Sequence, residues 1–486
     1  MIKKPTLTIA LIPILLLIAL LTTNVFLFED TLEGANQISL LLTAFVGMLI
    51  AWRLGYKWEA INHRIIKTIG SAMPSMIILL LIGSLAGTWL ISGIIPTMIY
   101  YGLGIINPVI FLFAAVVVSS IVSLVTGSSW STVATIGVAL LGIGKTLGFN
   151  EPMVAGAIIS GAYFGDKMSP LSDTTNLAPA MAGTDLFTHI RYMTITTIPS
   201  MSITLILFLA IGFSYSSNAQ TVDVSLVKTA IEEVFNVTPV LFLVPVILFA
   251  IIMLRVPAIP AMLIGSLLGA LFALIFQPDL IKSITGETAN YLKASYIGIM
   301  QAMFGDVTVT TTHTAVNELL STSGMRGMLN TVWLILSAMI FGGVMEGSGL
   351  LERITRPIVE KARSTGSLVA STVASCFFFN TTASDQYISI VVPGKMFKES
   401  YARKGLKPEV LSRTLEDSGT MTSVLIPWNT CGATQAKVLG VATISYLPYC
   451  FFNIISPLMS ILFAYTNYKI RRIEAPAKTL HPTRKD

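Results

Sequence analysis

The stretch that decides the fold is GAYFGDKMSPLSDTTNLA, residues 161–178. It contains Asp166, Lys167 and Asp173 together with several hydroxyl and amide side chains, although the chain as a whole is 53% hydrophobic. Polar side chains at membrane depth are costly, so they persist mainly where they face a partner, an ion or a water-filled cavity. The stretch is therefore the first candidate for a functional site.

Composition indicates an integral membrane protein. Only 12% of the 486 residues are charged, compared with roughly 25% in soluble domains. A membrane-spanning helix needs about 20 apolar residues, and runs close to this length recur along the chain. Their helical period excludes an outer-membrane β-barrel. The runs cover residues 7–28, 38–52, 69–91, 190–213, 240–254, 258–276, 332–345 and 441–465.

The basic residues indicate membrane orientation rather than a nucleic-acid partner. The net charge is +6, and the basic clusters at 53–67, 353–363, 395–413 and 469–485 all adjoin apolar runs. Positive charge beside a span favours the cytoplasmic side, so we expect a cytoplasmic N-terminus. Neither a phosphate-binding loop nor a paired cysteine metal motif is found in the sequence. We therefore expect no nucleotide-driven pump and no cofactor.

The first half predicts a re-entrant helical hairpin followed by a broken helix. Residues 109–143 form two apolar arms joined by the polar tip TGSSWST. Such a tip stays polar only where it is buried in protein or faces a cavity. Within residues 152–182, Pro170 lies between Asp166 and Asp173 and disfavours helical geometry at the residue before it. Broken helices of this kind supply ion ligands near the bilayer midplane of secondary transporters.

The second half repeats this order with an offset of about 252 residues. The polar segment NTTASD begins at Asn380, which follows Gly127 by 253 residues (380 − 127), and Asp417 follows Asp166 by 251 (417 − 166). Basic residues bracket the second hairpin but not the first. The two hairpins are therefore expected to enter the membrane from opposite faces, which makes the repeats inverted.

These patterns predict an all-α polytopic membrane protein with inverted structural repeats. We expect about 10 to 12 transmembrane helices, two re-entrant hairpins and two broken helices. The expected divisions are an N-terminal repeat at 1–215, a linker with an extra apolar helix at 216–257, a C-terminal repeat at 258–466 with its hairpin at 366–394 and its broken helix at 414–436, and a basic cytoplasmic tail at 467–486.

The polar residues of these elements suit a sodium ion, because hard cations prefer oxygen ligands. A carboxylate can bind either Na⁺ or a proton, so competition at a site open alternately to each face would already be antiport. The candidate ion- or substrate-binding residues are Asp166, Asp173, Asn176, Ser128, Ser129, Thr132, Asn380, Thr381, Asp385, Asp417 and Asn429. Na⁺ itself is assigned to Asp166, Asp173, Asp417, Ser128 and Asn380.

Each candidate also has a purely structural interpretation. Asp166 and the adjacent Lys167 could form a local ion pair. Asp173 and Asp417 could cap the halves of a broken helix. The hydroxyl and amide side chains could simply bond to backbone carbonyls.

Two further titratable residues are candidates for pH sensing. His313 lies in a threonine-rich run, and histidine titrates near neutral pH; a buried, hydrogen-bonded histidine is the alternative. Glu346 lies in the apolar run FGGVMEGSG, near the end of a predicted span. An interfacial position is the alternative role for this carboxylate.

Four motifs closely resemble the NhaC-type sodium/proton antiporter family, a branch of the ion transporter superfamily. They are GSSWSTVATIGVALLGIG from Gly127, GAYFGDKMSPLSDTTNLAPAMAGTDLFTHIRYM from Gly161, ASDQY from Ala383 and LEDSGTMTSVLIPWNTCGA from Leu415. The resemblance implies exchange of Na⁺ for H⁺ across the bacterial inner membrane, for sodium and pH homeostasis, by a transporter rather than an enzyme. It also implies a homodimer in which the hairpin-bearing domain moves like an elevator.

The resemblance leaves a second substrate class open, since similar sequences include exchangers that couple sodium and protons to malate and lactate. Lys167 is the only basic residue inside either broken stretch, which favours exchange of cations alone. However, the tip Asn380-Thr381-Thr382 resembles the amide and hydroxyl groups that hold carboxylates in related dicarboxylate carriers. An exchanger of small organic acids therefore remains the alternative.

Overall fold

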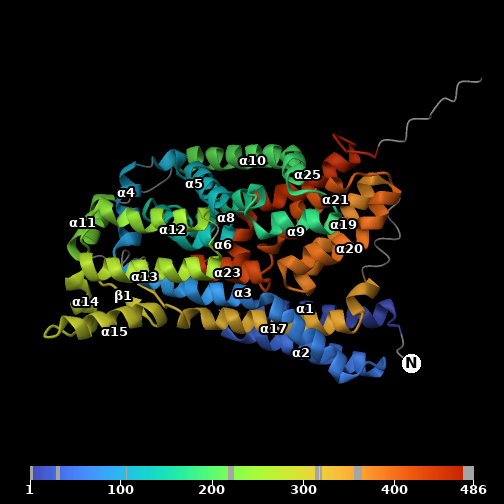
Figure 1. Cartoon of the computed structure of the whole chain (residues 1–486), viewed down its shortest axis with the longest axis horizontal. Helices are drawn as coiled ribbons and strands as arrows, with labels where there is room; N and C mark the ends of the chain where they lie inside the picture. Colours follow the sequence, from blue (N-terminus) through green and yellow to red (C-terminus); the bar gives the residue numbers. More distant parts are fainter. Residues whose placement is uncertain are drawn as a thin grey trace, which may run out of the picture.

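The computed structural model describes residues 4–28, 33–105, 107–216, 224–254, 256–311, 317, 320–354 and 364–473. Within these ranges the chain is almost entirely helical (Figure 1). The only strands there are β1 (Val307–Thr308) and β2 (Ser321–Thr322), which pair antiparallel. The all-α prediction is therefore confirmed.

The described part contains seven helices long and apolar enough to cross a membrane, which makes the protein a multi-pass membrane protein. Two further pairs of helices are bent by 88° and 59° and raise the count to nine if each is one span. The count leaves out the two broken helices, whose halves are short or charged. Five of them are α1 (Leu7–Leu27), α2 (Ala35–Arg53), α3 (Trp58–Ile91), α10 (Leu186–Ser216) and α13 (Ala258–Phe276). The other two are Pro108–Thr126, which contains α5 (Phe111–Thr126), and Arg326–Gly347, which contains α17 (Leu329–Gly347).

Shorter helices connect these spans. The first bent pair is α11 (Val224–Val234) with α12 (Leu243–Met253), and the second is α24 (Thr443–Tyr446) with α25 (Phe451–Tyr465). Helix α12 lies within the segment 216–257, for which the sequence predicts one apolar helix. The remaining connecting helices are α4 (Ile94–Ile105), α14 (Pro278–Thr285) and α15 (Tyr291–Phe304).

The helices gather into groups that each bury an apolar core. Residues of α1, α2, α3 and α17 share one cluster, which includes Leu17, Leu40 and Phe341. These helices lie together along the lower edge of Figure 1, whereas the hairpins and broken helices lie above them. The long helix α3 also packs against α13, with Gly265 accepting a hydrogen bond from the Trp89 indole at 3.1 Å. The polar elements therefore rest on a scaffold of long spans.

The first half of the chain contains a helical hairpin followed by a broken helix. Helix α5 ends at Gly127, whose positive φ of 67° reverses the chain into α6 (Ser129–Thr132), a π-helical turn and α7 (Val138–Thr146). Helix α8 (Glu151–Met168) stops before Pro170, and α9 (Asp173–Ala182) resumes after it. The break confirms the effect expected of Pro170, because the residue before a proline avoids helical geometry.

The second half contains the same sequence of elements. The hairpin consists of α19 (Thr365–Thr382) and α20 (Gln386–Arg403). The broken helix begins as α21 (Pro408–Leu415), continues through a π-helical turn into α22 (Met421–Ser423), and resumes as α23 (Thr430–Leu439). Pro427 lies within this second break.

The structure corrects the register of the repeat from about 252 to 257 residues. Matching backbone features recur at this spacing: the left-handed turn residues of the hairpins, the prolines of the breaks, and the left-handed glycines that end the broken helices. They are Gly127 and Ser384 (384 − 127), Pro170 and Pro427 (427 − 170), and Gly183 and Gly440 (440 − 183). At this offset Asp166 corresponds to Ser423, so Asp417 is not its structural counterpart.

The two halves approach the middle of the molecule from opposite ends. The long spans run across the view in Figure 1. Helices α5 and α8 lie left of the centre, whereas α19, α20 and α21 lie to its right. Because the spans mark the direction across the membrane, the hairpins point inward from opposite sides. This arrangement agrees with the inverted repeat.

Two glycines let α8 lie directly against the first hairpin. A Cβ atom at Gly161 would lie 2.3 Å from the Val116 carbonyl oxygen, and one at Gly165 would lie 2.5 Å from the Ser120 carbonyl oxygen. Ser123 also donates a 2.5 Å hydrogen bond to the Ala162 carbonyl. Small residues commonly allow such close helix contacts in membranes. The contact places the end of α8 beside the hairpin tip.

We expect Gly165→Ala to reduce the amount of folded protein, because overpacking a close contact costs about 1–3 kcal/mol. Gly70→Ala is the matched control, since nothing lies within 4 Å of a Cβ at this exposed position of α3. The measurement is the monodisperse fraction in size-exclusion chromatography after detergent extraction. Equal yields for the two variants would contradict the close contact.

Candidate functional site

The candidate site centres on Asp166, near the end of α8. Its carboxylate accepts two hydrogen bonds from Ser129 at the first hairpin tip, one from the backbone N–H at 3.1 Å and one from the hydroxyl at 2.6 Å. The Asp166 residue is only 8% exposed. The close packing of α8 on α5 thus joins the broken helix to the hairpin, as the sequence predicts for the polar elements.

Asp166 lines a cavity of about 680 Å³ to which both halves contribute. The first half supplies the hairpin tip and the break, and the second half supplies Gln386 and Tyr387 from α20 and Thr430 from α23. The predicted residues on its wall are Ser128, Asp166, Asp173 and Asn176. A polar cavity shared by two repeats is the arrangement found at substrate sites of secondary transporters.

The residues around the first break differ in their freedom to bind a ligand. Asp173 is exposed at the start of α9, and Ser172 is the residue whose hydroxyl caps that helix. The Asn176 amide donates to the carbonyls of Pro170 and Ser172, at 2.9 and 2.7 Å. The break therefore leaves the Asp173 carboxylate exposed. The Asn176 amide donates to two backbone carbonyls in the region where the helix is interrupted.

The hairpin tip is stabilised by its own hydroxyl groups. The Ser128 hydroxyl accepts from the Ser131 backbone N–H at 3.2 Å, and the buried Thr132 hydroxyl donates to the Ser128 carbonyl at 2.9 Å. Thr132 therefore has a local structural partner and does not line the cavity. Ser128 is half-buried and borders the cavity.

The second hairpin tip binds the second break through amide groups. The Asn380 amide donates to the Gly419 carbonyl at 2.8 Å and to the Thr422 hydroxyl at 2.9 Å. The Asn429 amide donates in turn to the side-chain oxygen of Asn380 at 3.1 Å. Both asparagines are fully buried, and neither lines the cavity around Asp166.

The two other polar residues of this hairpin have local partners. The Thr381 hydroxyl donates to the Phe377 carbonyl at 2.9 Å. The Asp385 carboxylate accepts from the Ile388 backbone N–H at 2.9 Å and so caps α20. Capping of this kind was the structural alternative for Asp173 and Asp417, and it is found here at Asp385. In this conformation neither residue borders the cavity.

Asp417 forms an ion pair with Lys167, which comes from the other half of the chain. Both side chains are fully buried. The carboxylate also accepts hydrogen bonds from Ser456 and Ser460 of α25, and the Arg413 Nε lies 4.0 Å away. Lys167 therefore does not pair with its neighbour Asp166. Asp417 does not line the cavity, so the structure does not unite all five residues assigned to Na⁺.

The structure adds two buried charged residues that sequence reasoning missed. Glu416 accepts a 3.0 Å hydrogen bond from the Thr174 hydroxyl, and its second oxygen has no hydrogen-bond partner in the described part of the chain. Arg413 stacks on the Tyr192 ring, with 4.5 Å between the guanidinium carbon and the ring centre. The run RTLED, at 413–417, was the available signal.

The two candidates for pH sensing lie elsewhere. The Glu346 carboxylate pairs with Arg64 of α3 at 3.3 Å, and the side chains are 32% and 39% exposed. This ion pair gives Glu346 a structural partner at the end of α17. His313 lies outside the described residues. Across the described ranges, no three acidic, histidine or cysteine side chains gather to hold a metal ion.

The repeated hairpins, the broken helices and the shared cavity define a membrane transporter. The chain belongs to the Na⁺/H⁺ antiporter family, whose model matches residues 161–468. It is 36% identical to the malate-2H⁺/Na⁺-lactate antiporter of Bacillus subtilis over 94% of both chains. It is 37% identical to the Na⁺/H⁺ antiporter NhaC of Alkalihalophilus pseudofirmus, covering 95% of this chain and 96% of that one. The NhaC of Bacillus subtilis is also 37% identical, with 95% and 98% covered.

Proposed function

We propose that the protein exchanges Na⁺ for H⁺ across the bacterial inner membrane by alternating access, for sodium and pH homeostasis. The observation that supports this most is the position of Asp166, a buried carboxylate on the wall of a cavity that both repeats line. Intramembrane carboxylates mark ion pathways and proton relays. Relatives named as Na⁺/H⁺ antiporters, at 37% identity over nearly the whole chain, support the same ions.

The proposed Na⁺ ligands are the oxygen atoms around the first break. Asp166 and Asp173 supply carboxylates, and Ser128 at the hairpin tip supplies a hydroxyl and a carbonyl. These are the hard ligands that such a cation prefers. Asp166 also keeps its two Ser129 hydrogen bonds, which hold the carboxylate in place while it binds either Na⁺ or a proton.

Asp417 has a different role in this proposal. Its charge is balanced by Lys167, so the pair joins the two broken helices and adds no net negative charge. Asn380 and Asn429 similarly hold the second hairpin tip against the second break. These residues shape the site from behind the cavity wall. The part of the ion site that faces the cavity is completed by Asp173, Thr174 and Tyr387.

The proposed orientation rests on the charge pattern of the sequence, and the proposed assembly rests on the family resemblance. The basic loops place the N-terminus on the cytoplasmic side, since positive residues are retained there. A homodimer is proposed by analogy with the resembled family. In this proposal the protein is embedded in the lipid bilayer and transports only Na⁺ and H⁺.

Exchange of small organic acids is the second candidate. The malate-2H⁺/Na⁺-lactate antiporter at 36% identity supports it. The charges around the cavity support cations instead: Lys167 is paired with Asp417, and neither Lys167 nor Arg413 is on the cavity wall. A bound carboxylate would meet Asp166 and Asp173, and the described residues that line the cavity include no cation to compensate.

We expect Na⁺ alone to support exchange. In proteoliposomes with an imposed pH gradient, adding Na⁺ should dissipate the gradient at the same rate with and without malate inside and lactate outside. The measurement is the fluorescence of a trapped pH indicator, and protein-free liposomes are the control. A strict requirement for the organic acids would favour the second candidate and contradict the first.

A further inference from the structure

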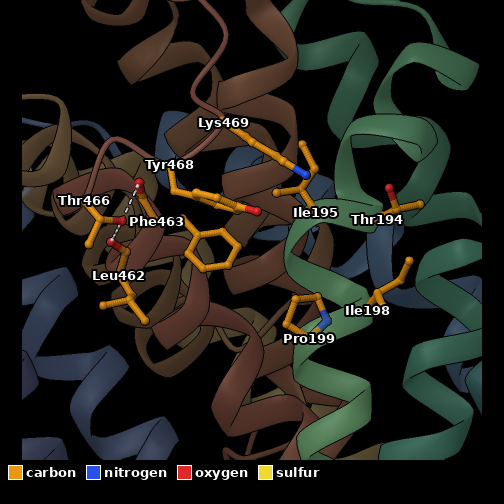
Figure 2. Close-up of a pocket in the computed structure, with 9 residues that line it drawn as sticks. All are labelled: Thr194, Ile195, Ile198, Pro199, Leu462, Phe463, Thr466, Tyr468 and Lys469. Carbon is orange, nitrogen blue, oxygen red and sulfur yellow. Dashed lines mark hydrogen bonds between the residues drawn. The ribbon is translucent and has the colours of Figure 1, made fainter.

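A groove on the outer surface lies away from the candidate site, between α10 and α25 (Figure 2). Its volume is about 590 Å³. Ile195 and Ile198 of α10 form one wall, and Leu462 and Phe463 of α25 form the other. Lys469, just beyond α25, reaches across one end toward Ile195 (Figure 2).

The walls of the groove have the character of a lipid-facing surface. Both α10 and α25 belong to candidate membrane spans. Ile198 is 59% exposed and Leu462 is 53% exposed, which in a span means that they face the hydrocarbon region or a partner. The groove therefore has apolar side chains on both walls, with Thr194 and Thr466 between them, and is open toward the bilayer.

One end of the groove is basic. Arg191 precedes Ile195 by four residues and Ile198 by seven, so these residues share one face of α10. Arg191 and Lys469 are both exposed, and neither forms an ion pair with a described residue. The nearby carboxylate of Glu409 is already paired with Arg471 at 3.2 Å. Two cations thus lie near this end, with no compensating anion among the described residues.

The position of Lys469 is fixed by the backbone. Its carbonyl accepts a 3.1 Å hydrogen bond from the Tyr192 hydroxyl of α10. Lys469 and Asn467 have positive φ values of 49° and 56°, a conformation that is unfavourable for residues other than glycine. The Lys407 N–H also donates to the Arg471 carbonyl at 3.1 Å. The turn is therefore held in place although it is strained.

Pro199 adds an acceptor to the groove wall. It has no backbone N–H, so the Ile195 carbonyl loses its usual helical partner. Both residues line the groove. A hydroxyl or amine on a bound headgroup could donate to this carbonyl.

We propose that the groove binds an anionic phospholipid. The phosphate contacts Lys469 and Arg191, and one acyl chain lies along Ile198, Leu462 and Phe463. The sequence predicts that this end faces the cytoplasm, because the basic segment 469–485 follows α25. Anionic lipids of that leaflet attract basic residues beside spans.

A second copy of the chain fits the groove less well. In a two-fold dimer the same patch contacts itself. The same patch would bring the cations Lys469 and Arg191 of both copies into one interface, which is unfavourable without intervening anions. The charge of the groove end therefore favours the lipid.

The test uses purified full-length protein in a neutral detergent, titrated with phosphatidylglycerol, phosphatidylcholine or inorganic phosphate. The readouts are the thermal unfolding midpoint and the lipid-bound fraction in intact-complex mass spectrometry. We expect saturable binding and a higher midpoint with phosphatidylglycerol only. Lys469→Gln should weaken the apparent affinity about fivefold, the size expected for one cation near an anionic headgroup. Ile198→Trp, which fills the groove, should abolish the saturable component.

Lys395→Gln is the matched control, because Lys395 is an exposed lysine on α20 that does not line the groove. It should leave the affinity unchanged. Equal binding of phosphatidylcholine, an equal effect of inorganic phosphate, or wild-type affinity in Lys469→Gln would each overturn the proposal. A dimer that dissociates in Ile198→Trp without loss of bound lipid would assign the groove to a second copy.

Discussion

Replacing Asp166 by asparagine is expected to reduce Na⁺-dependent proton movement to the level of vesicles that lack the protein. The variant removes the negative charge that either Na⁺ or a proton would neutralise. An asparagine oxygen can still accept the hydrogen bonds from Ser129, whose N–H and hydroxyl lie 3.1 and 2.6 Å from the carboxylate. The fold should therefore survive while the exchange is lost.

The measurement is the collapse of a respiration-generated pH gradient in everted membrane vesicles after Na⁺ is added. Immunoblotting of the same vesicles establishes that the variant reaches the membrane in normal amounts. Glu399→Gln is the matched control, because Glu399 is an exposed carboxylate on α20 outside the cavity. Full exchange by Asp166→Asn would remove Asp166 from the ion site.

Replacing one member of the Lys167–Asp417 pair should strongly destabilise the protein. Removing one partner of a fully buried ion pair leaves an uncompensated charge, which typically costs about 3–5 kcal/mol. Both side chains are 0% exposed and come from the two different broken helices. Asp417→Asn should be the more damaging change, because it leaves Lys167 and the nearby Arg413 without their carboxylate.

The double variant Lys167→Met/Asp417→Asn should recover much of the lost stability. Methionine keeps the apolar length of the lysine side chain. An asparagine can accept from one of Ser456 and Ser460 through its oxygen and donate to the other hydroxyl through its NH2 group. The measurement is the thermal unfolding midpoint of each detergent-purified variant. If the double variant were no more stable than the two single variants, the interaction would not be the paired charge inferred from the structure.

Much of the architecture could be predicted from the sequence because it depends on local properties. The membrane class follows from the length of the apolar runs. The break between α8 and α9 follows from Pro170, and the polar tip TGSSWST, which contains Ser129, identifies the first hairpin. The repeat itself was also recognisable, but its register was misjudged by about five residues. Similar polar composition suggested that Asp166 and Asp417 are equivalent, whereas the turns at Gly127 and Ser384 fix the spacing at 257 (384 − 127).

Within the candidate site, the sequence by itself determined which oxygen-bearing residues lie at the breaks and tips. Only the tertiary structure decided how they are used. Lys167 pairs with Asp417, 250 residues away, rather than with its neighbour Asp166, and Glu416 contacts Thr174 from the opposite half. The physical reason is that proline, glycine and the length of an apolar run act on the backbone near them in sequence. The neutralisation of a buried charge depends instead on which helices pack together. Asp166 therefore remains in the shared cavity, and Asp417 is buried within the ion pair behind it.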